Sequence, residues 1–372
     1  MLRSRCSIQT VCEAVRGEPG GTAREGRPLD YHENEDSLWD ADQRRWRVQF
    51  VVLYAALGLF FGGYAANYFR RYSTGWTQIT AIYACLMLLF GLALAPGFPA
   101  LRSRLRERVE GFRGAAGCTV LFLLPYLLYC AGTSDFRWPA FAKLLGLSAL
   151  PFGLFAAAPA RRPEQLHWQD AVVLLWLMLP VLFGKIGGIW NVPENLDFMV
   201  RLFLLGVGSW SFLISRKVEG SGYEFRCSPA CVGTVLVRLA GFAAVAIPVG
   251  FGLRFIAWNP QFQGAWALLF DYATIFLFVA VVEELFFRGL LQNLLEGSLH
   301  SRYGAQGVAA AVFGLSHIRH APSPNWRYVT LAAVAGWFYG SAYRSNRSLM
   351  ASTALHALVD TLWRTWFTLP RL

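Results

Sequence analysis

The sequence predicts an all-α fold: a polytopic integral membrane bundle with about eleven spanning helices. Two features of the composition lead to this prediction. The 372 residues are 55% hydrophobic and only 15% charged, whereas soluble domains carry about 25% charged residues. Aromatic residues make up 15% of the chain, and many stand at the ends of apolar runs, where amphipathic rings settle at headgroup depth.

The formal net charge of +11 fits a membrane protein that keeps Lys and Arg in cytoplasmic loops facing anionic lipid. The densest basic segment, 102–113, predicts a cytoplasmic loop, and the pairs Arg161-Arg162 and Arg216-Lys217 fall on the same side. No basic stripe with interleaved aromatic residues is present in the sequence, so nucleic acid is not an expected partner. If the chain is bacterial, we expect it in the inner membrane.

The chain divides into four segments by composition. Residues 1–47 are polar and mixed in charge, without apolar periodicity, and predict a disordered tail. Residues 48–215 hold N-terminal membrane helices whose role the sequence does not indicate. A polar loop is expected at 216–233, and residues 234–372 form a C-terminal core that contains nearly all the ionisable groups within apolar runs.

Each apolar run predicts one helix, because a spanning helix needs roughly 17 to 25 predominantly apolar residues. Some of the runs are short, so the count of about eleven has a margin of about two. The runs lie at residues 48–67, 77–96, 115–131, 144–160, 171–190, 199–215, 234–256, 268–295, 304–318, 328–343 and 350–367.

The most costly stretch is the one that places Glu283, Glu284 and Arg288 inside the run 268–295. A charged side chain at the centre of a membrane helix costs about 2.5 to 3.5 kcal/mol, so a passive anchor would not keep three. Glu284 and Arg288 are one helical turn apart and predict an ion pair. Glu283 is left without a counter-charge, which suits a general base. The alternative is an inert packing network of the three side chains.

Two histidines follow in the next apolar runs. His317 shares a helix face with Phe313, and His356 shares one with Asp360, because residues four apart lie on the same side of a helix. Either histidine alone is compatible with a hydrogen-bonded core residue. Together with Glu283 they form a set that can do acid and base chemistry. His320 is expected in a loop.

This pattern resembles the CPBP family of intramembrane proteases, which includes the CAAX prenyl endopeptidase and the bacteriocin-processing and self-immunity homologues. The resemblance rests on Glu283-Glu284-x-x-x-Arg288, Phe313-x-x-x-His317 and His356-x-x-x-Asp360, in this order, and covers about 268–367. It implies that Glu283 activates water with Glu284 as its partner, that Arg288 holds the site together, and that His317 and His356 are the two site histidines. Asp360 stands where the family more often has Asn.

The expected function is hydrolysis of a peptide bond in a membrane-associated protein or peptide within the lipid bilayer. Glu283 would activate water while His317 and His356 stabilise the oxyanion. Asp360 would either be protonated or orient His356. A metal-free mechanism is favoured; a zinc ion held by Glu283, His317 and His356 is the alternative.

Two other classes of function use the same buried charges: a transporter, or a catalytically idle immunity or scaffold protein. Coupled transporters often show an internal repeat, whereas here the polar groups gather at one end. Catalysis also makes a geometric demand, because base and oxyanion donors must reach one carbonyl. We therefore expect the helix that bears Glu283 to run to Glu296 or beyond, or the helices to tilt strongly. Either arrangement would bring Glu283, Glu284, His317, His356 and Asp360 around one cavity open to water.

Overall fold

The computed structural model describes residues 31–72, 74–159, 162–185, 187–193, 196–226 and 228–368. The chain forms two units, Met1–Arg45 and Trp46–Leu372, and the packing described below is that of the second. The described residues are mainly helical. Their strands are β1 (Ala257–Trp258) and β2 (Phe367–Thr368), which pair antiparallel and join the chain after α8 to the end of α14.

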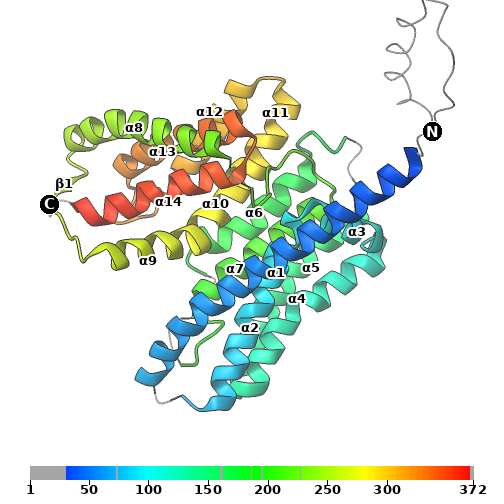
Figure 1. Cartoon of the computed structure of the whole chain (residues 1–372). Coiled ribbons are helices and arrows are strands. Elements are labelled where there is room, and N and C mark those ends of the chain that lie inside the picture. The colour runs from blue at the N-terminus through cyan, green and yellow to red at the C-terminus, as the bar shows by residue number, and fades with distance from the viewer. Residues whose placement is uncertain are drawn as a thin grey trace, which may run out of the picture. The chain divides into compact units, whose positions relative to one another are not determined.

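Every predicted apolar run coincides with a helix, so the all-α prediction is confirmed (Figure 1). The first half forms α1 (Tyr31–Arg71), α2 (Trp76–Leu94), η2 (Ala95–Gly97), α3 (Pro99–Arg108), α4 (Gly111–Thr133), α5 (Trp138–Ala157), α6 (Trp168–Leu182), α7 (Phe198–Ser209) and η3 (Trp210–Ser215). The second half forms α8 (Pro229–Gly252), α9 (Ala265–Ile275), η4 (Phe276–Ala280), α10 (Val281–Glu284), η5 (Leu285–Gln292), α11 (Asn293–Leu299), α12 (Arg302–Leu315), α13 (Trp326–Asn346) and α14 (Leu349–Trp366).

Several predicted boundaries differ from the structure, two of them at the limits of the segments defined by composition. α1 begins at Tyr31, inside the segment assigned to the polar tail, whose first 30 residues lie outside the described part of the chain. α8 begins at Pro229, earlier than expected, because the Ser228 side chain accepts a hydrogen bond from the backbone N–H of Cys231 and caps the helix.

Seven helices of the described residues are long and apolar enough to cross a membrane. The chain is thus a multi-pass membrane protein, although about eleven spans were expected. The difference comes from four helices. α6 and α12 are short, at 15 and 14 residues, while α13 and α14 are long enough but carry too many polar side chains.

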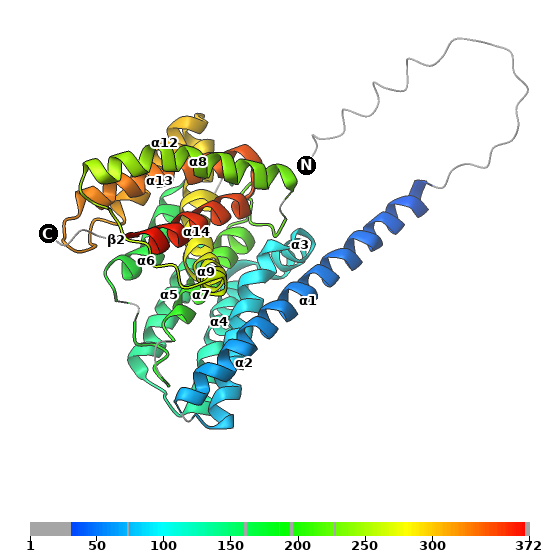
Figure 2. The same ribbon diagram turned by 60° about the vertical axis from the view of Figure 1, so that its left-hand side comes forward.

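The helices of the second unit lie in two groups. In both views α8, α12, α13 and α14 lie together, and α2, α4 and α5 form another group (Figures 1 and 2). α7 contacts α2 and α5 on one side and η4, α10 and η5 on the other. A Cβ atom at Gly208 would lie only 2.9 Å from the Phe286 ring, so glycine lets α7 approach η5 closely.

A buried ion pair fixes the end of η3. Arg216 donates from Nε to Asp170 Oδ1 at 2.9 Å and from Nη2 to Asp170 Oδ2 at 3.1 Å, and both side chains are at most 1% exposed. The guanidinium also donates to the carbonyls of Pro163 and Gln165. Arg216 therefore contributes to packing, and its charge does not help to assign this loop to the cytoplasm.

Candidate active site

The two glutamates lie in one continuous helix that runs from Ala265 to Leu299 as α9, η4, α10, η5 and α11. The expectation that this helix extends past Glu296 is confirmed. Its central turns are π-helical in η4 and again in η5, on either side of α10. π-Helical turns occur often at functional sites, since they change the direction in which side chains point.

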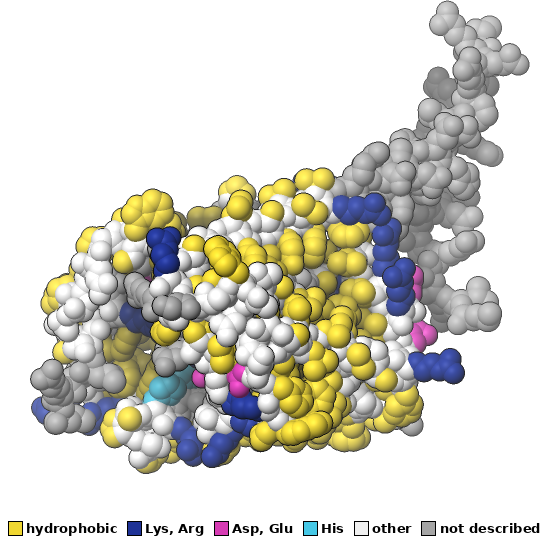
Figure 3. Space-filling model, turned by 90° about the horizontal axis from the view of Figure 1, so that it is seen from below, with side chains coloured by type: hydrophobic (Ala, Val, Ile, Leu, Met, Phe, Trp, Pro, Cys, Tyr) yellow, Lys and Arg dark blue, Asp and Glu magenta, His cyan; other side chains and the backbone are white. Residues whose placement is uncertain are grey.

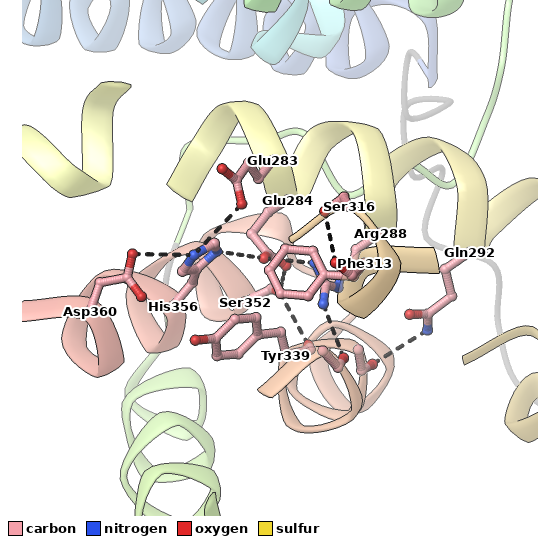
Figure 4. Close-up of polar contacts among 12 residues, drawn as sticks. Glu283, Glu284, Arg288, Gln292, Phe313, Ser316, Tyr339, Ser352, His356 and Asp360 are labelled. Atoms are coloured by element: carbon pink, nitrogen blue, oxygen red, sulfur yellow. Dashed lines mark hydrogen bonds and ion pairs between the residues drawn. The ribbon is translucent and has the colours of Figure 1, made fainter. Parts of the chain in front are cut away.

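Glu284 is fully buried, and both of its carboxylate oxygens are bound. Oε1 accepts hydrogen bonds from Arg288 Nη1 at 2.9 Å and from His356 Nδ1 at 2.8 Å, and Oε2 accepts one from the Ser352 hydroxyl. The ion pair predicted from the four-residue spacing is present (Figure 4). A carboxylate with these three partners is committed to holding the surrounding helices together.

Arg288 joins the same helix to its neighbours. It is fully buried, its Nη2 donates to the carbonyl of Gly336 in α13 at 3.0 Å, and its guanidinium lies 4.5 Å from the centroid of the Phe313 ring in α12. Further along, a Cβ at Gly340 would lie 2.5 Å from Oε1 of the Gln292 side chain, so α13 passes close to η5 here. The tight crossing explains why the Arg288 guanidinium can reach a backbone carbonyl.

His356 lies between three carboxylates, as Figure 4 shows. Glu284 holds Nδ1, whereas Nε2 is 3.9 Å from Glu283 Oε2 and 3.6 Å from Asp360 Oδ2. The Tyr339 ring stacks on the imidazole with centroids 4.5 Å apart and planes at 17°. Because the Glu284 carboxylate only accepts, Nδ1 carries the proton of that hydrogen bond, and Nε2 is directed toward the other two acids.

Glu283 differs from its neighbour Glu284 in exposure to solvent and in hydrogen bonding. Its side chain is 27% exposed and, among the described residues, its carboxylate accepts no hydrogen bond; its one ion-pair contact is the 3.9 Å approach of His356. The side chain of Asp360 is 36% exposed. Both acids line a cavity of about 550 Å³, together with His317 and His356.

His317 lies in the turn that follows α12 and also lines this cavity. Its Nδ1 is 2.9 Å from the carbonyl oxygen of Phe313. A carbonyl oxygen only accepts, so Nδ1 donates and Nε2 is left free for other partners. The ring stacks on His320 at a centroid distance of 5.4 Å. His320 lies after the helix, as predicted, and it too borders the cavity.

The cavity thus brings together four of the five residues expected around it. The exception is Glu284, which lies behind the wall because Arg288 and His356 hold it. Figure 3 shows histidine, acidic and basic side chains gathered at one place on a face that is otherwise largely apolar.

Two supporting residues were not predicted. The Ser352 hydroxyl donates to Glu284 and also lies 3.1 Å from the carbonyl oxygen of Tyr339, which can share its one proton, and the Tyr339 ring supports the ring of His356. The sequence holds one sign of the first, because Ser352, His356 and Asp360 are spaced four residues apart and share a face of α14. Tyr339 has no comparable sign, since its partner is in another helix.

A bound metal ion would need several His, Cys, Asp or Glu side chains close together. Across the part of the chain that the structure describes, no group of three His, Cys, Asp or Glu side chains is placed to hold a metal ion. The candidate ligands Glu283, His317 and His356 do not form such a group in this arrangement.

Comparison with known proteins agrees with this geometry. Residues 265–362 match the family model of type II CAAX prenyl endopeptidase Rce1-like proteins. This segment is similar to an Rce1-like domain. The match is consistent with the CPBP family and supports a membrane-embedded protease of the CAAX type. It contains Glu283, Glu284, Arg288, His317, His356 and Asp360, and it begins where the long helix begins.

No curated protein and no solved structure matches the chain. The helices before Ala265 lie outside the Rce1-like segment, although α7 contacts the helix that carries the glutamates.

Proposed function

We propose that this chain is an intramembrane endopeptidase that hydrolyses a peptide bond of a membrane-associated protein or peptide, with Glu283 as the general base. The observation that supports this most is the contrast between two adjacent glutamates. Glu284 is bound by three partners, whereas Glu283 is partly exposed and faces His356 across the cavity.

Water fits between the two groups that would act on it. The 3.9 Å between Glu283 Oε2 and His356 Nε2 exceeds a direct hydrogen bond, and an oxygen atom beside both could reach each at about 2.6 to 3.2 Å. Glu283 takes a proton from this water, and the oxygen attacks the carbonyl carbon of the scissile bond. The proton then passes from Glu283 to the leaving amine as the C–N bond breaks.

His356 donates to the oxyanion. Its Nδ1–H is held by Glu284, so Nε2 faces the cavity and donates to the oxyanion when the ring carries both protons, a charged state that the nearby carboxylates of Glu283, Glu284 and Asp360 favour. An ionised Asp360 cannot donate to an oxyanion, and its Oδ2 lies 3.6 Å from Nε2. Its proposed role is to orient His356.

His317 supplies a second imidazole whose Nε2 can act on the substrate or on the water. Because its Nδ1–H donates to Phe313, Nε2 donates to the oxyanion only when the ring carries both protons. In the neutral ring Nε2 accepts instead and would assist Glu283 in taking the proton from water. Either role keeps His317 at the reacting atoms.

The experiment uses the purified full chain in detergent and quenched fluorescent peptides. The name of the matching family makes a prenylated CAAX peptide the first substrate to test, beside unprenylated hydrophobic peptides. Cleavage by the wild type and by Glu107→Gln, an exposed control, with loss in Glu283→Gln, is the expected result. A folded, inserted protein that cleaves none of these peptides would favour a transporter or an idle scaffold.

The proposed mechanism uses no metal. Incubation with EDTA or 1,10-phenanthroline followed by dialysis should leave the rate of peptide cleavage unchanged. Loss of cleavage that returns on adding zinc would contradict this and place zinc among Glu283, His317 and His356.

A further inference from the structure

Charged side chains of both signs border the catalytic cavity. Glu283 and Asp360 are its acids, and three arginines also line it: Arg201 from α7, Arg319 from the turn after α12 and Arg364 from the end of α14. None of the mechanism above uses these arginines. Arg201 and Arg364 also lie outside the Rce1-like segment.

None of the three arginines forms an ion pair with a described residue, although the cavity holds two acids. Arg319 makes a cation–π contact, since its guanidinium lies 4.7 Å from the centroid of the Phe183 ring. Arg364 is one helical turn after Asp360 and shares its face of α14. Both are exposed.

Arg201 is the one of the three that is half-buried while its guanidinium makes a single weak contact with the described residues. Its hydrogen bond to a described residue is a long one, from Nη1 to the carbonyl of Phe278 at 3.4 Å. It is half-buried in a helix whose other residues from Met199 to Ser209 are all buried, so the helix is fixed while this one side chain reaches the cavity. Arg201 lies in the first turn of α7, where the helix dipole favours a bound anion.

The nearest acid in sequence, Asp197, forms no ion pair with Arg201, although both line the second cavity described below. Asp197 directly precedes α7, and its Oδ1 accepts a hydrogen bond from the backbone N–H of Gly188 at 3.1 Å. Arg201 also lines a second, largely apolar cavity of about 790 Å³, which shares Phe278, Val279 and Arg364 with the first. Arg201 therefore stands where an apolar groove meets the catalytic cavity.

We infer that Arg201, which lines the same two cavities as Arg364, binds a carboxylate of the peptide substrate and so fixes which bond lies at Glu283. A planar guanidinium matches a carboxylate with two parallel hydrogen bonds. Glu283 and Asp360 repel a second carboxylate, so an anionic end of the substrate is favoured at Arg201, and the scissile bond then faces Glu283. The cavity volume of about 550 Å³ suits a short peptide segment.

This inference rests on the proposed function, and it gives α7 a part in substrate selection. The carboxylate has two sources: the free C-terminus of the peptide, or an acidic side chain near the scissile bond. Four quenched peptides of one sequence separate them, with the C-terminus as acid or amide and a single position as Glu or Gln.

The variants are Arg201→Gln, Arg201→Lys and a matched control, Arg238→Gln. Arg238 is also half-buried with a 3.4 Å hydrogen bond, from Nη2 to Ser345 Oγ, and does not border the catalytic cavity. Loss of a charge-assisted hydrogen bond predicts that KM for the carboxylate peptide rises roughly 10- to 100-fold in Arg201→Gln, with a smaller change in kcat. Arg201→Lys should recover part of this, and Arg238→Gln should behave as wild type.

The peptide that lacks the carboxylate should show a high KM in the wild type and no further rise in Arg201→Gln. Dependence on the C-terminal acid assigns the site to the peptide end, and dependence on Glu assigns it to a side chain. Equal KM values for all four peptides in the wild type, or an equal rise for all four in Arg201→Gln, would overturn the inference.

A binding measurement separates this result from the proposed function. Fluorescence anisotropy of the same labelled peptides on Glu283→Gln and on Glu283→Gln/Arg201→Gln requires no turnover. A tenfold or greater loss of affinity limited to carboxylate peptides supports the inference even in a chain that does not cleave. Cleavage without this loss leaves the proposed function intact and overturns the role of Arg201.

Discussion

Two buried ion pairs in this protein have different environments. Asp170–Arg216 joins α6 to the end of η3, and the guanidinium also donates hydrogen bonds to backbone carbonyls. Glu284–Arg288 is equally buried, but its carboxylate also binds the side chain of His356, which faces the cavity. The comparison shows that burial of a charge pair does not identify a site. The second pair differs in being linked, through buried His356, to the partly exposed acids Glu283 and Asp360.

The largest expected effect concerns the base itself. Glu283→Gln keeps the shape of the side chain but removes the proton acceptor, and loss of a general base costs about 10²- to 10⁴-fold in rate. Its free energy of unfolding should change by no more than about 0.5 kcal/mol, because this carboxylate holds no other described helix by a hydrogen bond. Peptide turnover and thermal unfolding in detergent measure the two quantities.

Glu284→Gln sharpens the same test. It should lower stability more than Glu283→Gln and turnover less, because Glu284 is bound by Arg288, His356 and Ser352 behind the cavity wall. Equal turnover in Glu283→Gln and wild type would end the glutamate-base hypothesis.

Arg288→Ala should harm folding more than catalysis. It leaves Glu284 buried without its counter-charge, at a cost of about 3 to 5 kcal/mol of unfolding free energy. Adding Glu284→Gln in the same chain should restore part of that loss, which a double-mutant cycle measures. A fully stable but inactive Arg288→Ala protein would instead place Arg288 among the groups that act on the substrate.

Arg216→Ala is the counterpart in the other ion pair. It leaves Asp170 uncompensated, so a loss of about 3 to 5 kcal/mol is again expected. The fraction that remains folded should have wild-type kcat, since Arg216 does not border the catalytic cavity. Measuring kcat per folded molecule after size-exclusion chromatography checks this. A reduced kcat in that fraction would mean that the two pairs are not separate in function.

The sequence predicted those features that depend on spacing within one helix. The eleven apolar runs follow from the length of apolar stretches, and the pairing of Glu284 with Arg288 follows from their four-residue spacing; a single helix displays both along its own length. The span count was less exact, because α13 and α14 bury polar side chains inside the bundle and so have mixed composition.

Contacts between helices could not be predicted in the same way. Ser352 is 68 residues from Glu284, and Gly336 is 48 residues from Arg288, so no local pattern links either pair. The position of Glu284 behind the cavity wall also depends on His356 approaching from α14. Nothing in the sequence indicated that Arg201 lines the cavity, because α7 meets the C-terminal helices there only in the folded protein.

The smallest effect concerns Ser352, which tests whether the link from the ion pair to the cavity is more than packing. Removing its hydroxyl in Ser352→Ala takes one donor from buried Glu284 Oε2, and an unsatisfied buried acceptor costs about 1 to 3 kcal/mol. Ser148→Ala is the matched control, since this equally buried hydroxyl donates to carbonyls of its own helix, at 2.8 Å to Leu144.

The two variants should therefore diverge in both stability and rate. Ser148→Ala should lower the free energy of unfolding by less than about 1 kcal/mol, because the Leu144 carbonyl still accepts the backbone hydrogen bond of helix α5. Its turnover should be that of wild type. Ser352→Ala should lose more stability and also several-fold in kcat, because Glu284 then holds His356 less firmly in front of Glu283. If both serine variants keep wild-type turnover, the hydroxyl of Ser352 contributes to packing alone, and the orientation of His356 depends on Glu284 and the stacked ring of Tyr339.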